Sequence, residues 1–470
     1  MEPALIIPDE VGFRFAKEEW EQEGRQTTSL DEMVKELGIV EHSPVEVFAG
    51  KKILTLLCLN YHSRILLPIM QTLESRGATI EYFTAQAEAA FEITFKQNGL
   101  PYYHVSDFLT PSVANKVNTA YTTLSKEWQR LLLQDTNLQN VPLIIIDKIL
   151  RAMVESHFGI EAIIDHVKPD IVFSLHELNS WGVSLGYHAS KRGIPFFTFQ
   201  EGLCYSAIPM YKGHTYFSNA CFLWGDADRD VLIAAGNDSE KMPIVGNIDL
   251  VTAIQESNTP EQITKIRQEY HVGEDQKILL FLMGHSAYQQ IQAPEFIKFL
   301  WEHREYIALF RFHPIQGVDI TRNALSILGQ IPSVRHVGAD ANPYDLMASA
   351  DVSILVGAST TGIEALAFQR PLIQIDLPDT TYSYAEKGAV PRAATIEEAA
   401  AIAHDFIVNG LPHEWREKRE IYLKQHFANY EGAGIFNGGT VNRILHIVGE
   451  HFERELHKRS AQRVPIHAPA

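Results

Sequence analysis

The chain has 470 residues, 46% hydrophobic and 21% charged, which is typical of a globular protein with two or three domains. Its formal net charge of −18 argues against nonspecific binding to nucleic acid or to an anionic membrane surface. The 3 cysteines have no CxxC spacing, which argues against a disulfide framework or a zinc site and indicates a reducing setting.

The chain shows no pattern of membrane insertion. Residues 1–7 lack the basic and apolar regions of a signal peptide, and no apolar run reaches the ~18 residues of a membrane-spanning helix. We therefore expect a cytoplasmic protein. Residues 451–463 carry several basic side chains, which we interpret as a solvated helix end; peripheral contact with the inner membrane face is the alternative.

The first half of the chain predicts a doubly wound α/β sheet. Residues 1–50 are a polar, acidic extension with one or two predicted helices. We predict an N-terminal Rossmann-like domain over residues 51–250, with a long helical insert over residues 109–166. Its buried apolar runs, which indicate parallel strands, span residues 52–59, 78–83, 169–174, 195–199 and 220–225.

A second βα series follows a domain exit near residue 246. We predict a C-terminal Rossmann-like domain over residues 251–445 and a C-terminal helix and tail over residues 446–470. The fold class is thus α/β, with two Rossmann-like, doubly wound domains facing a cleft, and ligands bind such sheets at their carboxyl edge. The strands expected here span residues 277–282, 307–312, 334–337, 352–356 and 371–375.

One predicted strand runs straight into hydrogen-bond donors. Arg311 and His313 share a strand face, because side chains alternate between faces, and Pro314 ends the strand. A guanidinium and an imidazole at this edge can bind phosphate oxygens and neutralise charge on a departing nucleotide phosphate. Both residues are phosphate-binding candidates, and His313 is also a catalytic candidate; an ordinary His-Pro turn is the alternative.

A second strand end carries hydroxyls. Residues 352–356 lead through Gly357 into Ser359, Thr360 and Thr361, at the start of a predicted helix. Hydroxyls and free backbone N–H groups at such a start can bind phosphate. Glu364 could accept from a ribose or cap its own helix. These four polar residues are nucleotide-binding candidates, and a purely structural helix cap is the alternative.

Gln200-Glu201-Gly202 ends a strand of the first domain, so that Glu201 is expected to face the cleft. Its carboxylate could serve as general base on an acceptor hydroxyl, or as nucleophile. The alternative is a polar turn whose groups are satisfied internally.

Five further residues follow apolar strands. Gly284, which would allow close approach of a phosphate to the backbone, and His285 are nucleotide-side candidates. His62, Arg64 and Glu177 are acceptor-side candidates. The chain has no DxD pair flanked by apolar residues and no His/Asp metal spacing, so we expect no essential metal and no cofactor.

These residues resemble those of GT-B-fold glycosyltransferases over residues 50–445. His313-Pro314 is similar to the His-Pro motif of bacterial sialyl-, polysialyl- and capsule Kdo transferases and CDP-glycerol glycerophosphotransferases, whose histidine contacts the cytidine nucleotide's phosphate. Ser359-Thr360 is similar to their phosphate-holding serine motif. Gln200-Glu201-Gly202 resembles their motif of two acidic residues and a glycine, whose carboxylate serves as base, but Gln200 departs from the first acidic position.

The resemblance implies a metal-independent transferase that moves a nonulosonic acid or Kdo from a CMP-sugar donor to a surface glycan or glycoprotein, with Glu201 as base. Residues 245–247 and 357–364 also resemble the non-hydrolysing UDP-GlcNAc 2-epimerases, which share the fold. A UDP-sugar 2-epimerase or UDP-sugar transferase therefore stays open. So does a non-catalytic nucleotide-sugar-binding subunit of a polysaccharide assembly system, which Gln200 would fit. No nucleic-acid partner is expected.

Overall fold

A computed structural model describes the chain from residue 46 to residue 462 with several gaps. The described residues are 46–58, 60–85, 95–96, 98–134, 143–204, 213–284, 294–312, 329–338, 341–377 and 380–462. The helices expected in the N-terminal extension lie outside these residues.

A six-stranded parallel sheet forms the centre of the N-terminal half, with the strand order β3-β2-β1-β4-β5-β6. In this Rossmann-type order the sheet grows first to one side and then to the other, and the switch lies between β1 and β4. The strands are β1 (Lys52–Leu56), β2 (Thr79–Thr84), β3 (Tyr102–His104), β4 (Ile171–Ser174), β5 (Phe196–Phe199) and β6 (Ala220–Phe222).

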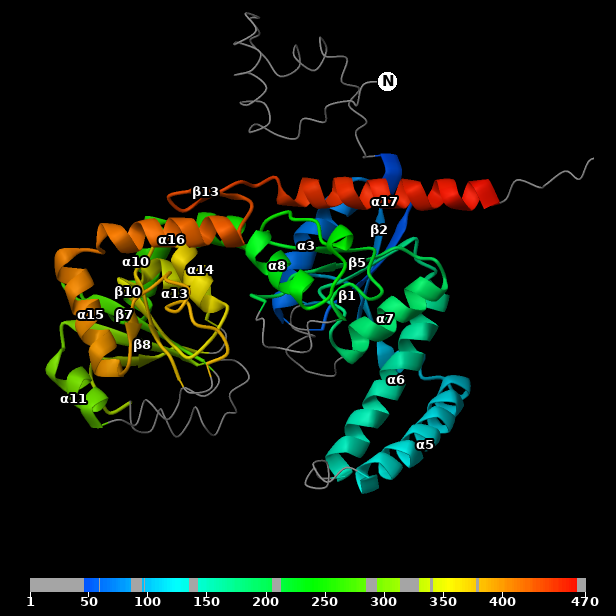
Figure 1. Ribbon diagram of the computed structural model, residues 1–470, viewed down its shortest axis with the longest axis horizontal. Coiled ribbons are helices and arrows are strands. Elements are labelled where there is room, and N and C mark those ends of the chain that lie inside the picture. The colour runs from blue at the N-terminus through cyan, green and yellow to red at the C-terminus, as the bar shows by residue number, and fades with distance from the viewer. Residues whose placement is uncertain are drawn as a thin grey trace, which may run out of the picture.

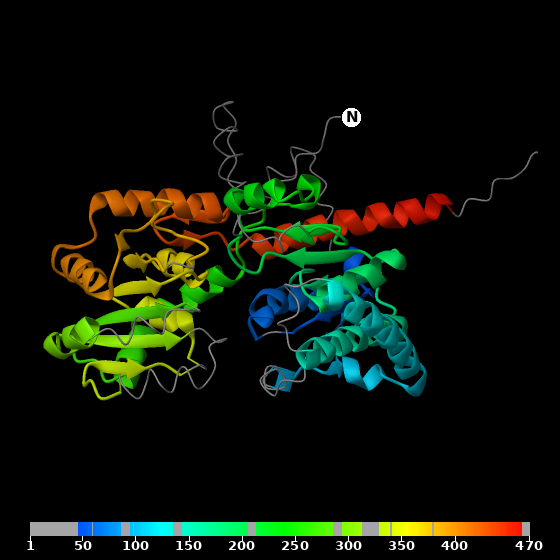
Figure 2. The ribbon, with the colours of Figure 1, turned by 60° about the horizontal axis from the view of Figure 1, so that its bottom comes forward.

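The C-terminal half repeats this arrangement. Its six-stranded parallel sheet has the order β12-β11-β10-β7-β8-β9, so its switch lies between β7 and β10. The strands are β7 (Lys277–Met283), β8 (Tyr306–Phe312), β9 (Val334–His336), β10 (Val352–Val356), β11 (Leu372–Ile375) and β12 (Arg392–Ala393). Figure 2 shows the two sheets in separate halves of the molecule.

Helices cover both faces of each sheet, and this explains why the strands are continuous apolar runs. Every residue of β4, β5, β10 and β11 is buried. On the second sheet, Leu280 of β7 packs in one apolar cluster with α9, α10, α13 and α14, and its neighbour Phe281 packs on the opposite face with α11 and α15. The first sheet is covered likewise by α3 and α17 on one face and by α6 and α7 on the other.

The helices are α3 (Asn60–Ser75), α5 (Pro111–Gln134), α6 (Leu143–Val167), α7 (Ser180–Lys191), α8 (Asp226–Ala234), α9 (Asp249–Ser257), α10 (Pro260–Glu269), α11 (Pro294–Glu302), α13 (Pro343–Ser349), α14 (Thr361–Ala367), α15 (Ile396–Asn409), α16 (His413–His426) and α17 (Thr440–Gln462). Short 3-10 helices are η1 (Glu46–Phe48), η2 (Val105–Phe108) and η4 (Ser239–Lys241). In Figure 1, α5 and α6 extend together away from the first sheet. None of the described helices is both long and apolar enough to span a membrane.

The chain crosses between the halves twice, and one side chain joins the crossings. Asn429, only 3% exposed, accepts a hydrogen bond from the Asn247 N–H (3.0 Å) and donates to the Asn247 carbonyl (2.9 Å). It also donates to the Asn437 carbonyl (3.2 Å) and to Thr440 Oγ1 (3.3 Å). A Cβ on Gly246 (φ +91°) would lie 2.5 Å from the Asn429 side chain, which explains the glycine there. We call this arrangement the Asn429 clasp.

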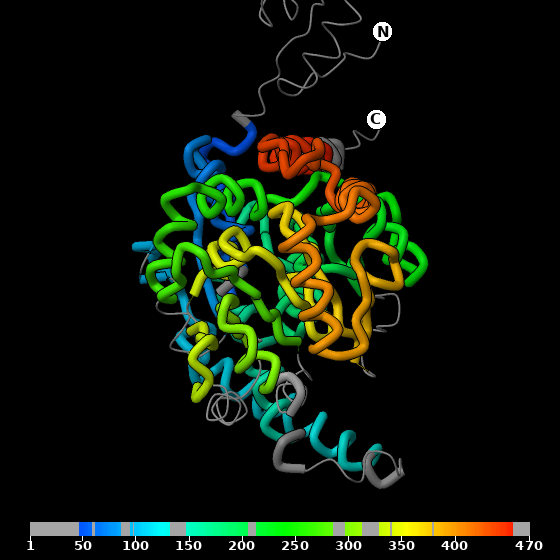
Figure 3. Tube along the Cα trace, turned by 90° about the vertical axis from the view of Figure 1, so that its left-hand side faces the viewer, coloured from blue at the N-terminus to red at the C-terminus, as the bar shows by residue number. Residues whose placement is uncertain are grey.

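After the second crossing the chain returns to the first domain. A small antiparallel hairpin, β13 (Tyr430–Gly432) and β14 (Ile435–Phe436), lies between α16 and α17. Ile444, Leu445, Val448 and Phe452 of α17 then pack into the core of the first sheet beside α3. Figure 3 shows α16 and α17 on the same side of the molecule, in orange and red.

Candidate active site

The two switch points define where a ligand would bind. The carboxyl ends of β1 and β4 lead into His62 and His176 in the first domain. The carboxyl ends of β7 and β10 lead into Gly284 and the turn at residues 357–361 in the second. Open α/β sheets bind ligands in the crevice beside such a switch, so the polar residues at these four strand ends form the candidate site.

In the first domain, Glu201 pairs with a histidine. Its Oε2 lies 2.6 Å from His176 Nε2. The His176 side chain is only 8% exposed, whereas the Glu201 side chain is 35% exposed, so the carboxylate is the accessible member of the pair. A carboxylate bonded to an imidazole can take up a proton from an acceptor hydroxyl, which is the chemistry expected of Glu201.

His62 lies behind this pair. Its Nδ1 accepts a hydrogen bond from the Cys58 N–H (3.3 Å), and its ring meets the His176 ring edge-on at 6.0 Å between centroids. Burial, assisted by the charge of His176 and opposed by that of Glu201, lowers the pKa of His62 to about 3. His62 is therefore a neutral imidazole at neutral pH, buried against His176.

Gln200 points away from the cleft. It is 1% exposed; its Oε1 accepts from the Trp224 N–H (2.8 Å) and its Nε2 donates to the Gly202 carbonyl (3.0 Å). An acidic residue here would lack the donor that Gly202 requires. The departure from the two-acid motif thus occurs at a position with a structural role.

Glu177 binds backbone groups within its own domain. Its carboxylate accepts hydrogen bonds from the N–H groups of Phe217 (3.0 Å) and Ser218 (3.1 Å) and from the Ser218 hydroxyl (3.4 Å). Burial raises its pKa to about 7, although these donors oppose the shift. The side chain secures the loop that leads into β6.

In the second domain, the hydroxyls after β10 are held in one turn. Ser359 Oγ accepts from both the N–H (3.3 Å) and the hydroxyl (2.9 Å) of Thr361. With Ser359 Oγ accepting these two bonds, its own hydroxyl hydrogen has no acceptor among the described residues, so it is available to donate to a ligand. This is the polarity needed to bind a phosphate oxygen.

The predicted free N–H groups at this helix start are not seen at residues 361–364. The N–H of Thr361 bonds to Ser359 Oγ, that of Gly362 to the Ser359 carbonyl (3.1 Å), and those of Ile363 and Glu364 to the Thr360 carbonyl (3.1 and 3.3 Å). The Ser359 hydroxyl and the carbonyls of Ser359 and Thr360 satisfy these four donors, so the expectation of free N–H groups was wrong for them. The hydroxyls are the more suitable phosphate ligands.

Thr360 joins the two domains. Its Oγ1 accepts from the Leu203 N–H at 3.4 Å, and a Cβ on Gly202 would lie only 2.7 Å from the same oxygen. The segment that carries Glu201 therefore touches the turn that carries Ser359. This contact brings the candidate base of one domain to the candidate phosphate ligands of the other.

Arg64 and Arg311 lie close to a half-buried acidic pair, Asp249 and Glu364. Arg64 Nε lies 3.4 Å from Asp249 Oδ2, and its guanidinium lies over the Tyr344 ring at 4.9 Å. The Tyr344 hydroxyl contacts both Asp249 Oδ2 (2.5 Å) and Glu364 Oε1 (3.1 Å). Burial raises the pKa of Glu364, while the charges of Arg64 and Arg311 oppose that shift. Glu364 makes no hydrogen bond to the start of its own helix, so it does not cap that helix, whereas Ser359 Oγ, which accepts from the Thr361 N–H, does satisfy a donor of the first turn.

Arg311 retains unused binding capacity. Its Nε is buried and has no hydrogen-bond partner among the described residues, and burial lowers its pKa. A buried, incompletely paired guanidinium is a favourable partner for an anion.

Gly284 packs against the backbone at the end of β10. Its N–H donates to the Val356 carbonyl (2.8 Å), and a Cβ would lie 2.7 Å from that oxygen, so the glycine lets β7 and the β10 turn pack closely. His285 and His313 lie outside the described residues, and their roles stay predictions.

Sequence reasoning missed His176, Asp249 and Tyr344. His176 is two residues past the end of β4, a position that strand-end reasoning could have selected beside Glu177. Asp249 and Tyr344 meet Arg64 only through the tertiary fold, and no local pattern marks them. Among the described residues, no group of three or more His, Cys, Asp or Glu side chains could hold a metal ion.

Solved structures with a similar fold come from nucleotide-sugar enzymes. UDP-GlcNAc 2-epimerase from Neisseria meningitidis bound to UDP-GlcNAc matches with a TM-score of 0.58 and 12% identity, covering 85% of this chain and 100% of that chain. UDP-GlcNAc 2-epimerase from Methanocaldococcus jannaschii, in complex with UDP-GlcNAc and UDP, matches with a TM-score of 0.56 and 16% identity, covering 85% of this chain and 99% of that chain. A glycosyltransferase from Rickettsia africae matches with a TM-score of 0.50 and 15% identity, covering 87% of this chain and 99% of that chain.

These likenesses show the fold. The chain has the two-domain GT-B fold, which confirms the fold class predicted from its sequence. No family model matches the sequence, and no curated protein matches it either. The epimerase structures hold uridine nucleotides, so they give no support to the narrower resemblance to cytidine-dependent transferases.

Proposed function

We propose that this chain is a glycosyltransferase that uses a nucleotide-activated sugar. Glu201 takes the proton of an acceptor hydroxyl, while Ser359, Thr360 and Arg311 bind the donor phosphate. The observation that carries this proposal is the Leu203–Thr360 contact, which brings the Glu201–His176 pair to the Ser359 turn across the domains. In this proposal the first domain supplies the base and the second domain supplies the phosphate ligands, and the contact brings the two sets together.

The transfer step follows from these positions. The acceptor oxygen bonds to the anomeric carbon of the sugar as its proton passes to the Glu201 carboxylate. The bond between that carbon and the nucleotide phosphate breaks, and its electron pair stays on the phosphate. The Ser359 hydroxyl and the Arg311 guanidinium stabilise the charge that develops there.

We further propose a cytidine nucleotide as donor, carrying a nonulosonic acid or Kdo, and a surface glycan or glycoprotein as acceptor. This finer proposal rests on the His313-Pro314 and Ser359-Thr360 motifs. With the domain limits predicted from the sequence, we propose that the donor binds mainly to residues 251–445 and the acceptor mainly to residues 51–250.

A UDP-sugar 2-epimerase or UDP-sugar transferase is the second candidate. The observation that favours it is the likeness in fold to epimerases bound to UDP-GlcNAc. An epimerase would convert UDP-GlcNAc without any acceptor, whereas a transferase of either nucleotide class releases nucleotide at an appreciable rate only when an acceptor hydroxyl is present.

A thermal-shift panel tests the nucleotide. CMP, CDP, UMP, UDP and GDP would be compared, first without metal and then with magnesium. A ligand at ~100 times its dissociation constant stabilises by about 2.7 kcal/mol. Stabilisation by CMP alone supports the cytidine donor, stabilisation by UDP alone supports the second candidate, and the absence of any shift contradicts both.

The role of Glu201 is tested with the nucleotide sugar so identified. Glu201→Gln is expected to lower kcat by about 10²–10⁴-fold, the usual contribution of a general base, with the nucleotide Kd unchanged. Glu256→Gln, an exposed change on α9, serves as the control. Full-rate turnover by Glu201→Gln would rule Glu201 out as the base.

A further inference from the structure

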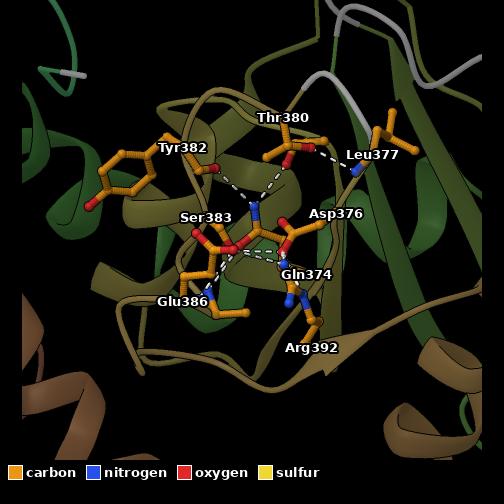
Figure 4. A network of polar contacts seen from close by, with 10 residues as sticks. Gln374, Asp376, Leu377, Thr380, Tyr382, Ser383, Glu386 and Arg392 are labelled. Atoms are coloured by element: carbon orange, nitrogen blue, oxygen red, sulfur yellow. Dashed lines mark hydrogen bonds and ion pairs between the residues drawn. The ribbon is translucent and has the colours of Figure 1, made fainter. Parts of the chain in front are cut away.

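The loop that follows β11 folds back on itself through side-chain hydrogen bonds (Figure 4). Asp376 Oδ2 accepts from Ser383 Oγ (2.7 Å) and from the Arg392 guanidinium (2.6 Å). The Leu377 N–H donates to Thr380 Oγ1 (2.7 Å). These bonds fix the segment around residues 382–385, which lies against the β10 turn.

Gln374, at the end of β11, joins this segment to that turn. It is fully buried. Its Nε2 donates to the Gly357 carbonyl (3.0 Å) and to the Tyr382 carbonyl (3.2 Å), and its Oε1 accepts from the Ala385 N–H (3.1 Å). Gly357 has φ +82°, a conformation that glycine adopts readily and that starts the turn toward Ser359.

Tyr384 holds the other side of the turn. Its hydroxyl donates to the Ser359 carbonyl (2.7 Å) and accepts from the Ile363 N–H (3.1 Å). Its ring, also fully buried, lies against Gly362, where a Cβ would come within 2.6 Å of it. One hydroxyl thus joins the residue before Thr360 to the first turn of α14.

Together these bonds fix the backbone on both sides of Ser359 and Thr360 from a segment that lies beyond the site. The orientation of the Ser359 hydroxyl, and the position of the Thr360 hydroxyl against Leu203, both depend on that backbone. A hydroxyl donor binds an anion well only if its direction is set before binding, because fixing it afterwards costs conformational entropy.

We propose that Tyr384 and Gln374 are positioning residues that hold the turn at residues 357–361 in the conformation that receives the donor phosphate. This inference rests on the proposed function, and it adds two residues that do not themselves touch the ligand. It also accounts for a tyrosine hydroxyl and a glutamine amide buried among apolar residues beside the site.

Two tyrosines make a matched test. Tyr384→Phe removes the hydroxyl that binds the turn. Tyr382→Phe removes a neighbouring hydroxyl that bonds to Tyr422 instead, and the two rings lie 5.1 Å apart. Tyr384→Phe loses two hydrogen bonds and Tyr382→Phe loses the one to Tyr422, so both urea midpoints should fall, that of Tyr384→Phe by more. Only Tyr384→Phe should weaken nucleotide binding.

The measurement is the Kd of CMP and UDP for the full chain by titration calorimetry. For whichever nucleotide binds, we expect Tyr384→Phe to raise the Kd about fivefold to tenfold, the size of one hydrogen bond, and Tyr382→Phe to leave it unchanged. Gln374→Met, which keeps the volume and removes the bonds to Gly357, Tyr382 and Ala385, should weaken nucleotide binding as Tyr384→Phe does, and it provides the test if that variant does not fold.

The outcomes separate the two proposals. If the unaltered chain binds neither nucleotide, the proposed function fails and this inference fails with it. If it binds one, and Tyr384→Phe and Gln374→Met bind equally well, only the positioning role is overturned. An equal loss of affinity in Tyr382→Phe would also overturn it, because the effect would then be one of general stability.

Discussion

Removing the Asn429 side chain is the change that most directly tests how the two domains are joined. Asn429→Ala leaves the buried N–H and carbonyl of Asn247 without the partners that they have at 3.0 and 2.9 Å. Each buried backbone group left unpaired costs about 1–3 kcal/mol, and water entering the vacated space recovers part of it. We expect the free energy of unfolding to fall by about 2–4 kcal/mol.

Urea denaturation is the suitable assay. An unfolding entropy of about 2.1 cal/mol/K per residue over 470 residues gives about 1 kcal/mol/K, so the melting temperature would fall by only about 2–4 °C. The urea midpoint resolves such a change better, because the slope of free energy on denaturant is large for a chain of this size.

Asn442→Ala is the matched control. Asn442 lies on α17, is exposed, and accepts a hydrogen bond from Arg76 (2.8 Å) on the surface of the first domain. Its loss should change stability by no more than about 0.5 kcal/mol. If the free energy of unfolding of Asn429→Ala also changes by no more than about 0.5 kcal/mol, the Asn429 clasp does not stabilise the crossings and the reasoning is refuted.

Three further predictions concern the site. Gly202→Ala places a Cβ 2.7 Å from Thr360 Oγ1 and should lower turnover with little change in the urea midpoint; unchanged turnover would mean that this contact is not needed. Gln200→Glu removes the donor to the Gly202 carbonyl and buries a charge, so it should destabilise the chain by about 2–4 kcal/mol without raising turnover; a stable, more active variant would contradict this. Burial lowers the pKa of His62 to about 3 in the folded chain, from an ordinary value of 6.5. The unfolded chain therefore binds more protons between these pH values, and stability is full above pH 6.5 and lost as pH falls. The slope is about 1.4 kcal/mol per pH unit. Urea midpoints at pH 7 and pH 5 should show this loss in the native chain and less of it in His62→Gln; equal losses in both would contradict the assignment.

The sequence was sufficient to predict the fold because the strands are buried on both faces. Each central strand is a continuous apolar run, which is what parallel strands covered by helices require. Two edge strands were not predicted. The residues of β3, Tyr102–His104, are half-exposed at one edge of the first sheet, and β12, at the edge of the second sheet, has only two residues. The hairpin of β13 and β14 was also missed, because strands of three and two residues are too short to show an alternating or apolar pattern.

Only the part of the site that lies at the ends of predicted strands could be predicted from the sequence. The rule that ligands bind beyond the carboxyl edge selected Glu201, Ser359 and Thr360. It gave no information on what those side chains would contact, because His176 is 25 residues from Glu201 and Leu203 is 157 residues from Thr360 in the sequence. The same limit applies to Gln200: its amide donates to Gly202, two residues along the chain, but it also accepts from the Trp224 N–H, which is 24 residues away.

Some contacts between the domains use groups that the proposed ligand would also use. Thr360 Oγ1 accepts from Leu203, and Arg64 of the first domain binds Asp249 beside Glu364 and Arg311 of the second. The Asn429 clasp, in contrast, uses no candidate ligand group. A phosphate that recruits Thr360 or Arg311 must therefore change the strength of the domain contacts. By reciprocity, any change that alters those contacts must alter phosphate affinity by the same factor. Phosphate binding and the contacts at Thr360 and Arg64 are in this way coupled, whereas the Asn429 clasp is independent of the ligand.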